Sequence, residues 1–173
     1  MPSIMPPKKR HVPIYIEPSA YATHFVVKAV TGAGQGLFAR QSLPANTRIA
    51  YTGKEIDKAE YKRLESLNMD KKNAKHKYIG YIFASGKRDT FIDANPRYPG
   101  SELWYAGRVN EPSTGVTANM VAKVERPKGE PPRLVFVTVR PIEKNEELTL
   151  HYGPGYTRVG YRVGRTPKKP SWL

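Results

Sequence analysis

Hydrophobic positions along this chain fall in short runs rather than in a long helical period. The runs are rich in β-branched and aromatic residues and are bounded by Gly, Pro, Asn or Asp, which is typical of strands. They cover residues 24–30, 48–51, 77–83, 90–93, 120–124 and 134–139. The pattern predicts a strand-rich α+β chain with many loops, and it fits neither a Rossmann fold nor a helix bundle.

One helix has a clear N-terminal signature. Asp57 precedes an apolar-periodic stretch and Glu60 follows three residues later, as in a capping box, in which side chains satisfy backbone N–H groups at the helix start. We expect this helix over residues 58–67. A shorter helix, capped by a serine, is expected over 101–106.

The composition narrows the possible chemistry. The chain has 173 residues, enough for one domain, and no Cys, which excludes a thiol nucleophile, a disulfide framework and a Cys-ligated zinc site. Lys and Arg number 29 against 15 Asp and Glu, a formal net charge of +14. This excess favours contact with polyanions, although a well-solvated basic surface fits equally well. No apolar run is long enough for a membrane span or a signal-peptide core, so we expect an intracellular protein.

A glycine-rich loop, Gly32-Ala33-Gly34-Gln35-Gly36, follows the first predicted strand. A Walker loop would need Gly-Lys-Ser/Thr, and a dinucleotide fingerprint would need G-x-G-x-x-G at the start of a helix. Here the spacing is G-x-G-x-G, and the glycines interrupt the strand before a second short run at 37–40. Both phosphate-binding interpretations therefore fail. Either the loop is an ordinary β-turn, or its backbone approaches a ligand closely because no Cβ intervenes.

Five segments, in this order, together resemble the motifs of the SET-domain protein lysine methyltransferases. They are Gly34-Gln35-Gly36-Leu37-Phe38-Ala39, Tyr51-Thr52-Gly53, Phe91-Ile92-Asp93-Ala94, Arg108-Val109-Asn110 and Leu148-Thr149-Leu150-His151-Tyr152-Gly153. The resemblance covers residues 23–156 and implies a mostly β SET fold of several small sheets. In that fold the C-terminal segment threads under a loop, which brings Asn110 and Tyr152 together.

The resemblance implies a site for S-adenosyl-L-methionine as cofactor, with S-adenosyl-L-homocysteine as its product and no metal. The backbone of Gly34, Gln35 and Gly36 is expected to bind the amino-acid end of the cofactor. Asn110 can supply a donor and an acceptor to a polar cofactor group. Glu111 stands where most members have His, a residue that contacts the cofactor largely through its backbone. PR/SET-type members also lack this His, so we expect Glu111 to keep the cofactor-binding role.

The same resemblance implies the catalytic residues and the channel for the substrate lysine. Tyr152 corresponds to the active-site tyrosine, and Tyr51 to an aromatic wall of the channel. Tyr156 is a further candidate for this wall. Leu150 occupies the position where many members have a Phe or Tyr that sets the number of methyl groups added, so the degree of methylation stays open. His151 replaces the usual Asp, and strand alternation predicts that it points away from Tyr152.

The chain is expected to have three parts. Residues 1–11 form a disordered basic N-terminus, residues 12–156 a SET-like catalytic domain, and residues 157–173 a basic C-terminal segment. Many members carry zinc modules beside this core, which a chain without Cys cannot build, so the C-terminal segment has to close the site. Trp172 in this segment is a candidate for packing over the cofactor, and equally for a terminal hydrophobic anchor.

The implied substrate is a histone tail or a nucleosome, and the implied location is the nucleus, with a non-histone substrate as a further possibility. Histone tails are basic, as this chain is, so binding needs either a local acidic groove or docking on nucleosomal DNA through the basic surface. The candidates for an acidic groove are Asp57, Glu60, Glu65, Asp70 and Asp89. The basic segment Lys8-Lys9-Arg10 fits an import signal or an arbitrary basic terminus. The alternative function is a catalytically inactive SET-like module that binds chromatin or nucleic acid by its charge.

Overall fold

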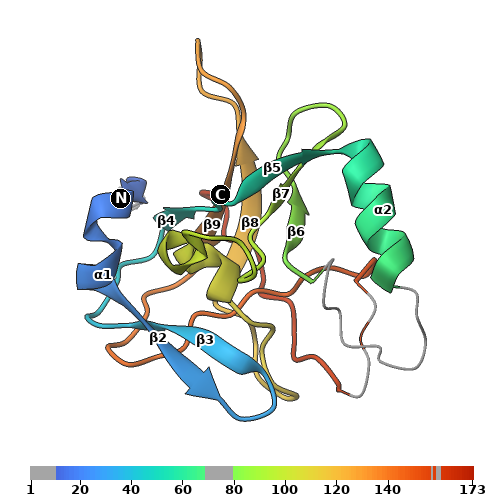
Figure 1. Ribbon diagram of the computed structural model, residues 1–173. Coiled ribbons are helices and arrows are strands. Elements are labelled where there is room, and N and C mark those ends of the chain that lie inside the picture. The colour runs from blue at the N-terminus through green and yellow to red at the C-terminus, as the bar shows by residue number, and fades with distance from the viewer. Residues whose placement is uncertain (1–10, 69–79, 157, 159–160) are drawn as a thin grey trace, which may run out of the picture.

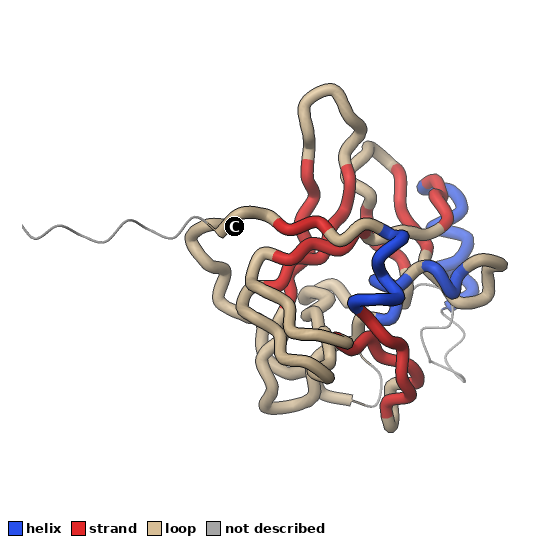
Figure 2. The backbone as a smooth tube through the Cα atoms, turned by 90° about the vertical axis from the view of Figure 1, so that its left-hand side faces the viewer, coloured by secondary structure: helices blue, strands red, loops and turns tan. Residues whose placement is uncertain are grey.

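The computed structural model describes residues 11–68, 80–156, 158 and 161–173. Within them the strands form three small sheets and the helices are few and short (Figure 1). Loops make up much of the chain between these elements (Figure 2). This architecture confirms the predicted mostly β class, while the threading of the C-terminal segment stays a prediction. The expected disordered tail lies outside the described residues, except for His11.

The largest sheet has four strands. Their order is β1 (Ile14–Tyr15), β4 (Thr47–Ala50), β9 (Arg133–Thr138) and β8 (Met120–Glu125). β1 runs parallel to β4, and the other neighbours are antiparallel. The runs predicted for β4, β8 and β9 match these strands to within one residue at each end. β1 was not predicted, because two residues are too few to show an alternation.

Successive residues of β9 point to opposite faces of this sheet, and each face has its own hydrophobic cluster. Phe136 belongs to the main core of the protein. Val135 and Val137 join Val121 in a second cluster, against which Trp172 packs. The sheet therefore lies between the main core and the C-terminal end of the chain.

The second sheet is an antiparallel hairpin of β2 (Phe25–Val30) and β3 (Gly34–Ala39) (Figure 1). The predicted break after the first strand is confirmed at the turn that contains Gly32, but the second strand begins earlier than expected, because β3 includes Gly34 and Gly36. Gly34 has a φ of +81°, a left-handed conformation that favours glycine. A Cβ at Gly36 would lie 2.5 Å from Glu147 Oε1, so any larger residue there would require the Glu147 side chain to shift.

The third sheet contains β5 (Lys54–Asp57), β7 (Thr90–Asp93) and β6 (Ile82–Ala84), with β7 in the centre. β7 has the bounds predicted from the sequence. β6 covers the end of the predicted run 77–83, of which residues 77–79 lie outside the described part. β5 was not predicted, because three of its four residues are charged.

α2 (Lys58–Asn68) follows β5 directly and confirms the helix predicted over 58–67. The N–H of Glu60 donates to Asp57 Oδ1 at 2.8 Å, which is the expected N-terminal cap. On the outer surface of the helix, Glu60 forms an ion pair with Arg63 at 2.6 Å. Local sequence signals thus determine where this helix begins.

The other helical elements of the described residues are single turns. They are η1 (Pro18–Ala20), α1 (Tyr21–His24), η3 (Ser101–Leu103) and η4 (Tyr105–Arg108). The prediction of one serine-capped helix over 101–106 is wrong, because the Ser101 hydroxyl donates back to Pro96 O at 2.9 Å instead of capping. None of the described helices has the length and apolar composition needed to span a bilayer.

A strand-like segment, 147–150, joins distant parts of the chain through backbone hydrogen bonds. Leu148 N–H donates to Leu37 O of β3 at 2.8 Å, and Leu150 N–H donates to Asn110 O at 2.9 Å. The first residue of β8 also pairs with this segment. The glycine loop, the Asn110 loop and the approach to the tyrosine motif therefore meet here.

The C-terminal segment lies along loop 112–118. Gly164 N–H donates to Pro112 O at 2.8 Å, and Arg165 N–H donates to Val116 O at 2.7 Å. A Cβ on Gly164 would lie 2.0 Å from Val116 O, closer than any real contact allows. Glycine is therefore required for this close approach of two backbones.

Gly164→Ala is expected to lower the free energy of unfolding by about 1–3 kcal/mol, as overpacking of a tight site does. Urea unfolding measures this change. Gly155→Ala is the matched control, because a Cβ there meets nothing within 4 Å. Equal unfolding midpoints for the two variants would contradict the close packing of the C-terminal segment.

Candidate active site

Four aromatic side chains lie within or beside the main core, and we call them the aromatic cluster: Tyr51, Phe83, Tyr152 and Tyr156. Tyr152 stands edge-on to Phe83, with ring centroids 5.8 Å apart, and edge-on to Tyr156 at 4.9 Å. The ring of Tyr51 lies 5.0 Å from Phe83. The structure therefore brings together the three tyrosines predicted for the site. Phe83 was missed, because its position in a predicted strand indicated only a structural role.

The hydroxyl groups of two of these tyrosines are fixed by backbone carbonyls. Tyr152 donates to Val109 O at 2.6 Å. Tyr51 donates to Tyr81 O at 2.6 Å. Because a phenol has one proton, each oxygen then offers only its lone pairs to a ligand. The cluster therefore presents oriented acceptors within an apolar wall.

The ionisation of these tyrosines is strongly suppressed. Burial raises the pKa of Tyr152 well above its usual range, and the neighbouring Tyr51, Tyr156 and Glu111 add to the rise. Burial likewise raises the pKa of Tyr51, with a further contribution from Asp93. Both hydroxyls are therefore neutral at physiological pH, and neither has the properties of a general base.

Asn110 binds the glycine loop directly. Its Nδ2 donates to Gln35 O at 2.9 Å and to Glu147 Oε1 at 3.1 Å. Its neighbour in the chain is Val109, whose carbonyl holds the Tyr152 hydroxyl. The predicted cofactor residues on β3 and the predicted catalytic tyrosine are thus joined through two consecutive residues. Glu147 was missed, because acidic residues before a strand-like motif are usually solvated.

The Glu111 side chain turns toward the tyrosine motif. It is only 3% exposed, and its Oε1 accepts the backbone N–H of Tyr152 at 2.8 Å. The same carboxylate binds Arg158 at 2.5 Å and accepts the Tyr161 hydroxyl at 3.0 Å. The carboxylate is thus engaged by the protein itself, which leaves the backbone of Glu111 for the contact that the resemblance implies.

Two other predicted positions have structural surroundings. Leu150 is 2% exposed and packs in the main core, where it pairs with Met120. The Nδ1 atom of His151 accepts the N–H of Gly153 at 3.1 Å. The structure thus gives His151 a local turn contact, whereas Leu150 forms part of the core beneath the tyrosine motif.

Trp172 packs in the second hydrophobic cluster and not against the aromatic cluster. Its ring packs against Val121, Val135 and Val137, and it lies 5.1 Å from the ring of His11. These valines occupy the face of the sheet opposite to Phe136, which contacts Tyr51 in the main core. The structure therefore supports the role of Trp172 as a hydrophobic anchor rather than as a cover for the cofactor.

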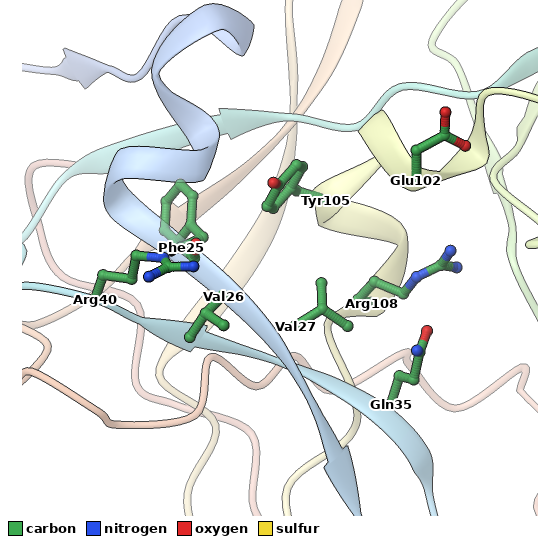
Figure 3. A pocket seen from close by; sticks show the side chains of 8 residues that line it. All are labelled: Phe25, Val26, Val27, Gln35, Arg40, Glu102, Tyr105 and Arg108. Carbon is green, nitrogen blue, oxygen red and sulfur yellow. Dashed lines mark hydrogen bonds between the residues drawn. The ribbon is translucent and has the colours of Figure 1, made fainter.

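A hollow of about 290 Å³ opens beside the glycine loop (Figure 3). It is lined by Phe25, Val26, Val27, Gln35, Arg40, Glu102, Tyr105 and Arg108. Figure 3 shows Gln35 and Arg108 at one end of the hollow and Arg40 at the other. One predicted cofactor residue, Gln35, therefore borders a recess with three charged side chains.

Among the side chains that line this hollow, Arg108 has a buried donor that a ligand could pair with. Its Nη1 atom is buried and has no hydrogen-bond partner within the described part of the chain. An unpaired buried donor is costly, and a guanidinium pairs best with a carboxylate or phosphate. Among the residues described, no three His, Asp or Glu side chains gather as around a metal ion. The sequence motif contained Arg108 but gave no sign of its unpaired donor.

A comparison with protein families identifies the family to which this site belongs. The SET-domain model matches residues 34–153, more than half of the chain. This range begins in the glycine loop and ends just after Tyr152, so it spans the site. The chain belongs to the SET-domain family, whose members are in general protein lysine methyltransferases that use S-adenosyl-L-methionine. The comparison with curated proteins gave no match.

Proposed function

We propose that this protein transfers a methyl group from S-adenosyl-L-methionine to the side-chain amine of a protein lysine. One observation carries the proposal: the Tyr152 hydroxyl is fixed on Val109 O, and the next residue, Asn110, binds the glycine loop. These two contacts connect the tyrosine that we assign to the lysine amine with the loop that we assign to the cofactor. Membership of the SET-domain family supports the same reaction class.

The residues around the glycine loop fit the cofactor. The unpaired Nη1 of Arg108 suits the carboxylate of its amino-acid end. Gln35 borders the same hollow, and Asn110 holds its backbone carbonyl at 2.9 Å. When bound, the cofactor supplies an electrophilic methyl group on a positively charged sulfur.

The protein's contribution to the reaction is alignment and orientation. The aromatic cluster excludes water from the lysine side chain and holds it in line with the methyl group, an effect worth up to about 7–11 kcal/mol in favourable cases. The oxygens of Tyr152 and Tyr51 accept hydrogen bonds from the amine, because their own protons are donated to carbonyls. With the cofactor bound, the unprotonated amine would take its methyl group while the electrons of the carbon–sulfur bond stay on sulfur, which would give S-adenosyl-L-homocysteine.

The rate of transfer is expected to rise with pH up to about pH 10. The substrate lysine must lose its proton, and its unperturbed pKa is near 10.4. The pKa values of Tyr152 and Tyr51 are raised by burial, so neither tyrosine ionises in this interval to reduce the rate. Initial rates measured from pH 6 to pH 10 test this. A decline within that range that disappears in Tyr152→Phe would show that the tyrosine ionises.

We further propose that the substrate is a histone in a nucleosome, that DNA assists docking, and that the protein acts in the nucleus. The net charge of +14 suits contact with nucleosomal DNA. The acidic-groove alternative is less well supported. Glu60 and Asp89 form ion pairs with side chains of α2, and Asp57 caps that helix. Asp70 lies outside the described residues.

A methyl-transfer assay with labelled cofactor on core histones, nucleosomes and a lysine-peptide array tests the function. We expect transfer, with a preference for nucleosomes over free histones that falls as salt concentration rises. A preference for free histones at every salt concentration would contradict docking on DNA.

Calorimetric titration with S-adenosyl-L-homocysteine separates the enzyme from its alternative. Binding together with transfer supports the enzyme. Binding without transfer to any of these substrates would favour the inactive SET-like module. The absence of both binding at millimolar ligand and transfer would overturn the proposal.

A further inference from the structure

The carboxylate of Glu111 accepts hydrogen bonds from three residues near the C-terminal end of the chain, Tyr152, Arg158 and Tyr161. Oε1 accepts the N–H of Tyr152 at 2.8 Å and Arg158 Nη2 at 2.5 Å. Oε2 accepts Arg158 Nε at 2.9 Å and the Tyr161 hydroxyl at 3.0 Å. Four donors converge on one carboxylate that is 3% exposed. Such a charge is stable in a buried place only because it is paired and hydrogen-bonded throughout.

Arg158 uses its remaining donors on the turn after Tyr152. Its Nη2 also reaches Gly153 O at 3.0 Å, and its Nη1 reaches Tyr156 O at 2.9 Å. A guanidinium can hold such contacts at once because its donors form a rigid planar fork. One side chain therefore connects Glu111 with both ends of the turn 153–156.

This turn sets the position of Tyr156 relative to Tyr152. Gly153 has a φ of +96°, so the chain bends sharply directly after Tyr152. The bend places the Tyr156 ring edge-on to Tyr152, with centroids 4.9 Å apart. The backbone N–H of Tyr152 is held at Glu111 while its hydroxyl is held at Val109 O. Tyr152 is thus fixed both at its backbone N–H and at its hydroxyl group.

We propose that Glu111 and Arg158 form a clasp that positions Tyr152 and Tyr156 and so closes the lysine channel. The proposal rests on the proposed methyl transfer. It also accounts for the acidic residue at position 111, because only a carboxylate accepts the Tyr152 N–H and pairs bidentately with arginine. The chain has no Cys for a Cys-ligated zinc site, and this ion pair fastens the C-terminal segment. Arg158 acts through the tyrosines and is a positioning residue.

Arg158→Met tests the clasp by kinetics. We expect kcat for methyl transfer to fall by about tenfold to a hundredfold, the scale of a small misplacement of reacting groups. The dissociation constant for S-adenosyl-L-homocysteine and the KM for the cofactor should stay near the wild-type values. Arg158→Lys keeps the charge without the fork, so we expect an intermediate kcat. Arg162→Met, with an exposed side chain in the same segment, is the matched control and should behave as wild type.

The two members of the clasp should act as a unit. Glu111→Gln combined with Arg158→Met is expected to lower kcat no further than the worse single variant. Additive losses would overturn the clasp. Loss of cofactor binding in parallel with kcat in Arg158→Lys and Arg158→Met would overturn a positioning role, since it would show a general loss of structure.

Hydrogen exchange of the Tyr152 amide gives a readout that does not need catalysis. We expect exchange to accelerate by about tenfold or more in Arg158→Met and to stay unchanged in Arg162→Met. Unchanged exchange in Arg158→Met would overturn the proposal, as would faster exchange with wild-type kcat. If the wild-type protein transfers no methyl group to any substrate, this result contradicts the proposed function. The exchange rates still show whether the clasp exists.

Discussion

Tyr152→Phe is expected to lower kcat for methyl transfer by about 10²-fold or more, the scale seen when one preorganised polar group is removed. Phenylalanine keeps the ring contacts with Phe83 and Tyr156 but removes the oxygen that orients the amine. The lost hydrogen bond to Val109 O costs about 1 kcal/mol of stability, so the protein should stay folded. Single-turnover transfer and thermal unfolding, measured on one preparation, test both expectations.

Tyr15→Phe is the control for this variant. It removes a hydroxyl that donates to Glu125 on the four-stranded sheet, outside the aromatic cluster. We expect wild-type transfer from Tyr15→Phe. If Tyr152→Phe also kept full activity, the assignment of Tyr152 as the catalytic residue would be wrong.

Asn110→Ala is expected to weaken binding of S-adenosyl-L-homocysteine by about tenfold or more. The amide Nδ2 holds Gln35 O and Glu147 Oε1, so its removal releases the glycine loop from the tyrosine motif. The substitution also removes a donor from the half-buried Glu147 carboxylate, which further weakens the contact between the loop and the tyrosine motif. Calorimetry on the purified variant measures the dissociation constant.

Gln41→Ala controls for the loss of an amide side chain, because Gln41 is exposed and lies beyond the end of β3. Its affinity for the ligand should equal that of the wild type. Unchanged affinity in Asn110→Ala would show that the glycine loop keeps its shape without this side chain, and would remove Asn110 from the cofactor site.

Elements with strong local signals were predictable from the sequence. β7 and α2 were found where expected, because turn residues and a capping aspartate mark their ends. β5 was not, since its charged residues show no apolar alternation, and the break expected at the glycines is limited to the turn at Gly32, because Gly34 and Gly36 belong to β3. In that strand, Gly34 supplies a left-handed backbone conformation and Gly36 lies close to Glu147.

The site was predictable only as far as the motifs reach. The order of the motifs placed Gly36, Asn110 and Tyr152 in one site, and the structure shows the contacts that join them. The pairing of Glu111 with Arg158 crosses 47 positions of the chain, and no local pattern indicates which buried acid a distant arginine will meet. The position of Trp172 was equally undetermined, because it depends on which face of a sheet the chain end reaches.

The two tryptophans of the chain lie in different hydrophobic clusters, which has a practical use in spectroscopy. Trp104 packs against the main core, and Trp172 packs on the outer face of the four-stranded sheet. Trp172→Phe therefore leaves a fluorophore that reports on the half of the protein containing the aromatic cluster. Trp104→Phe leaves one that reports on the docking of the chain end. Emission from the two single-tryptophan proteins would show whether both halves unfold together or in succession.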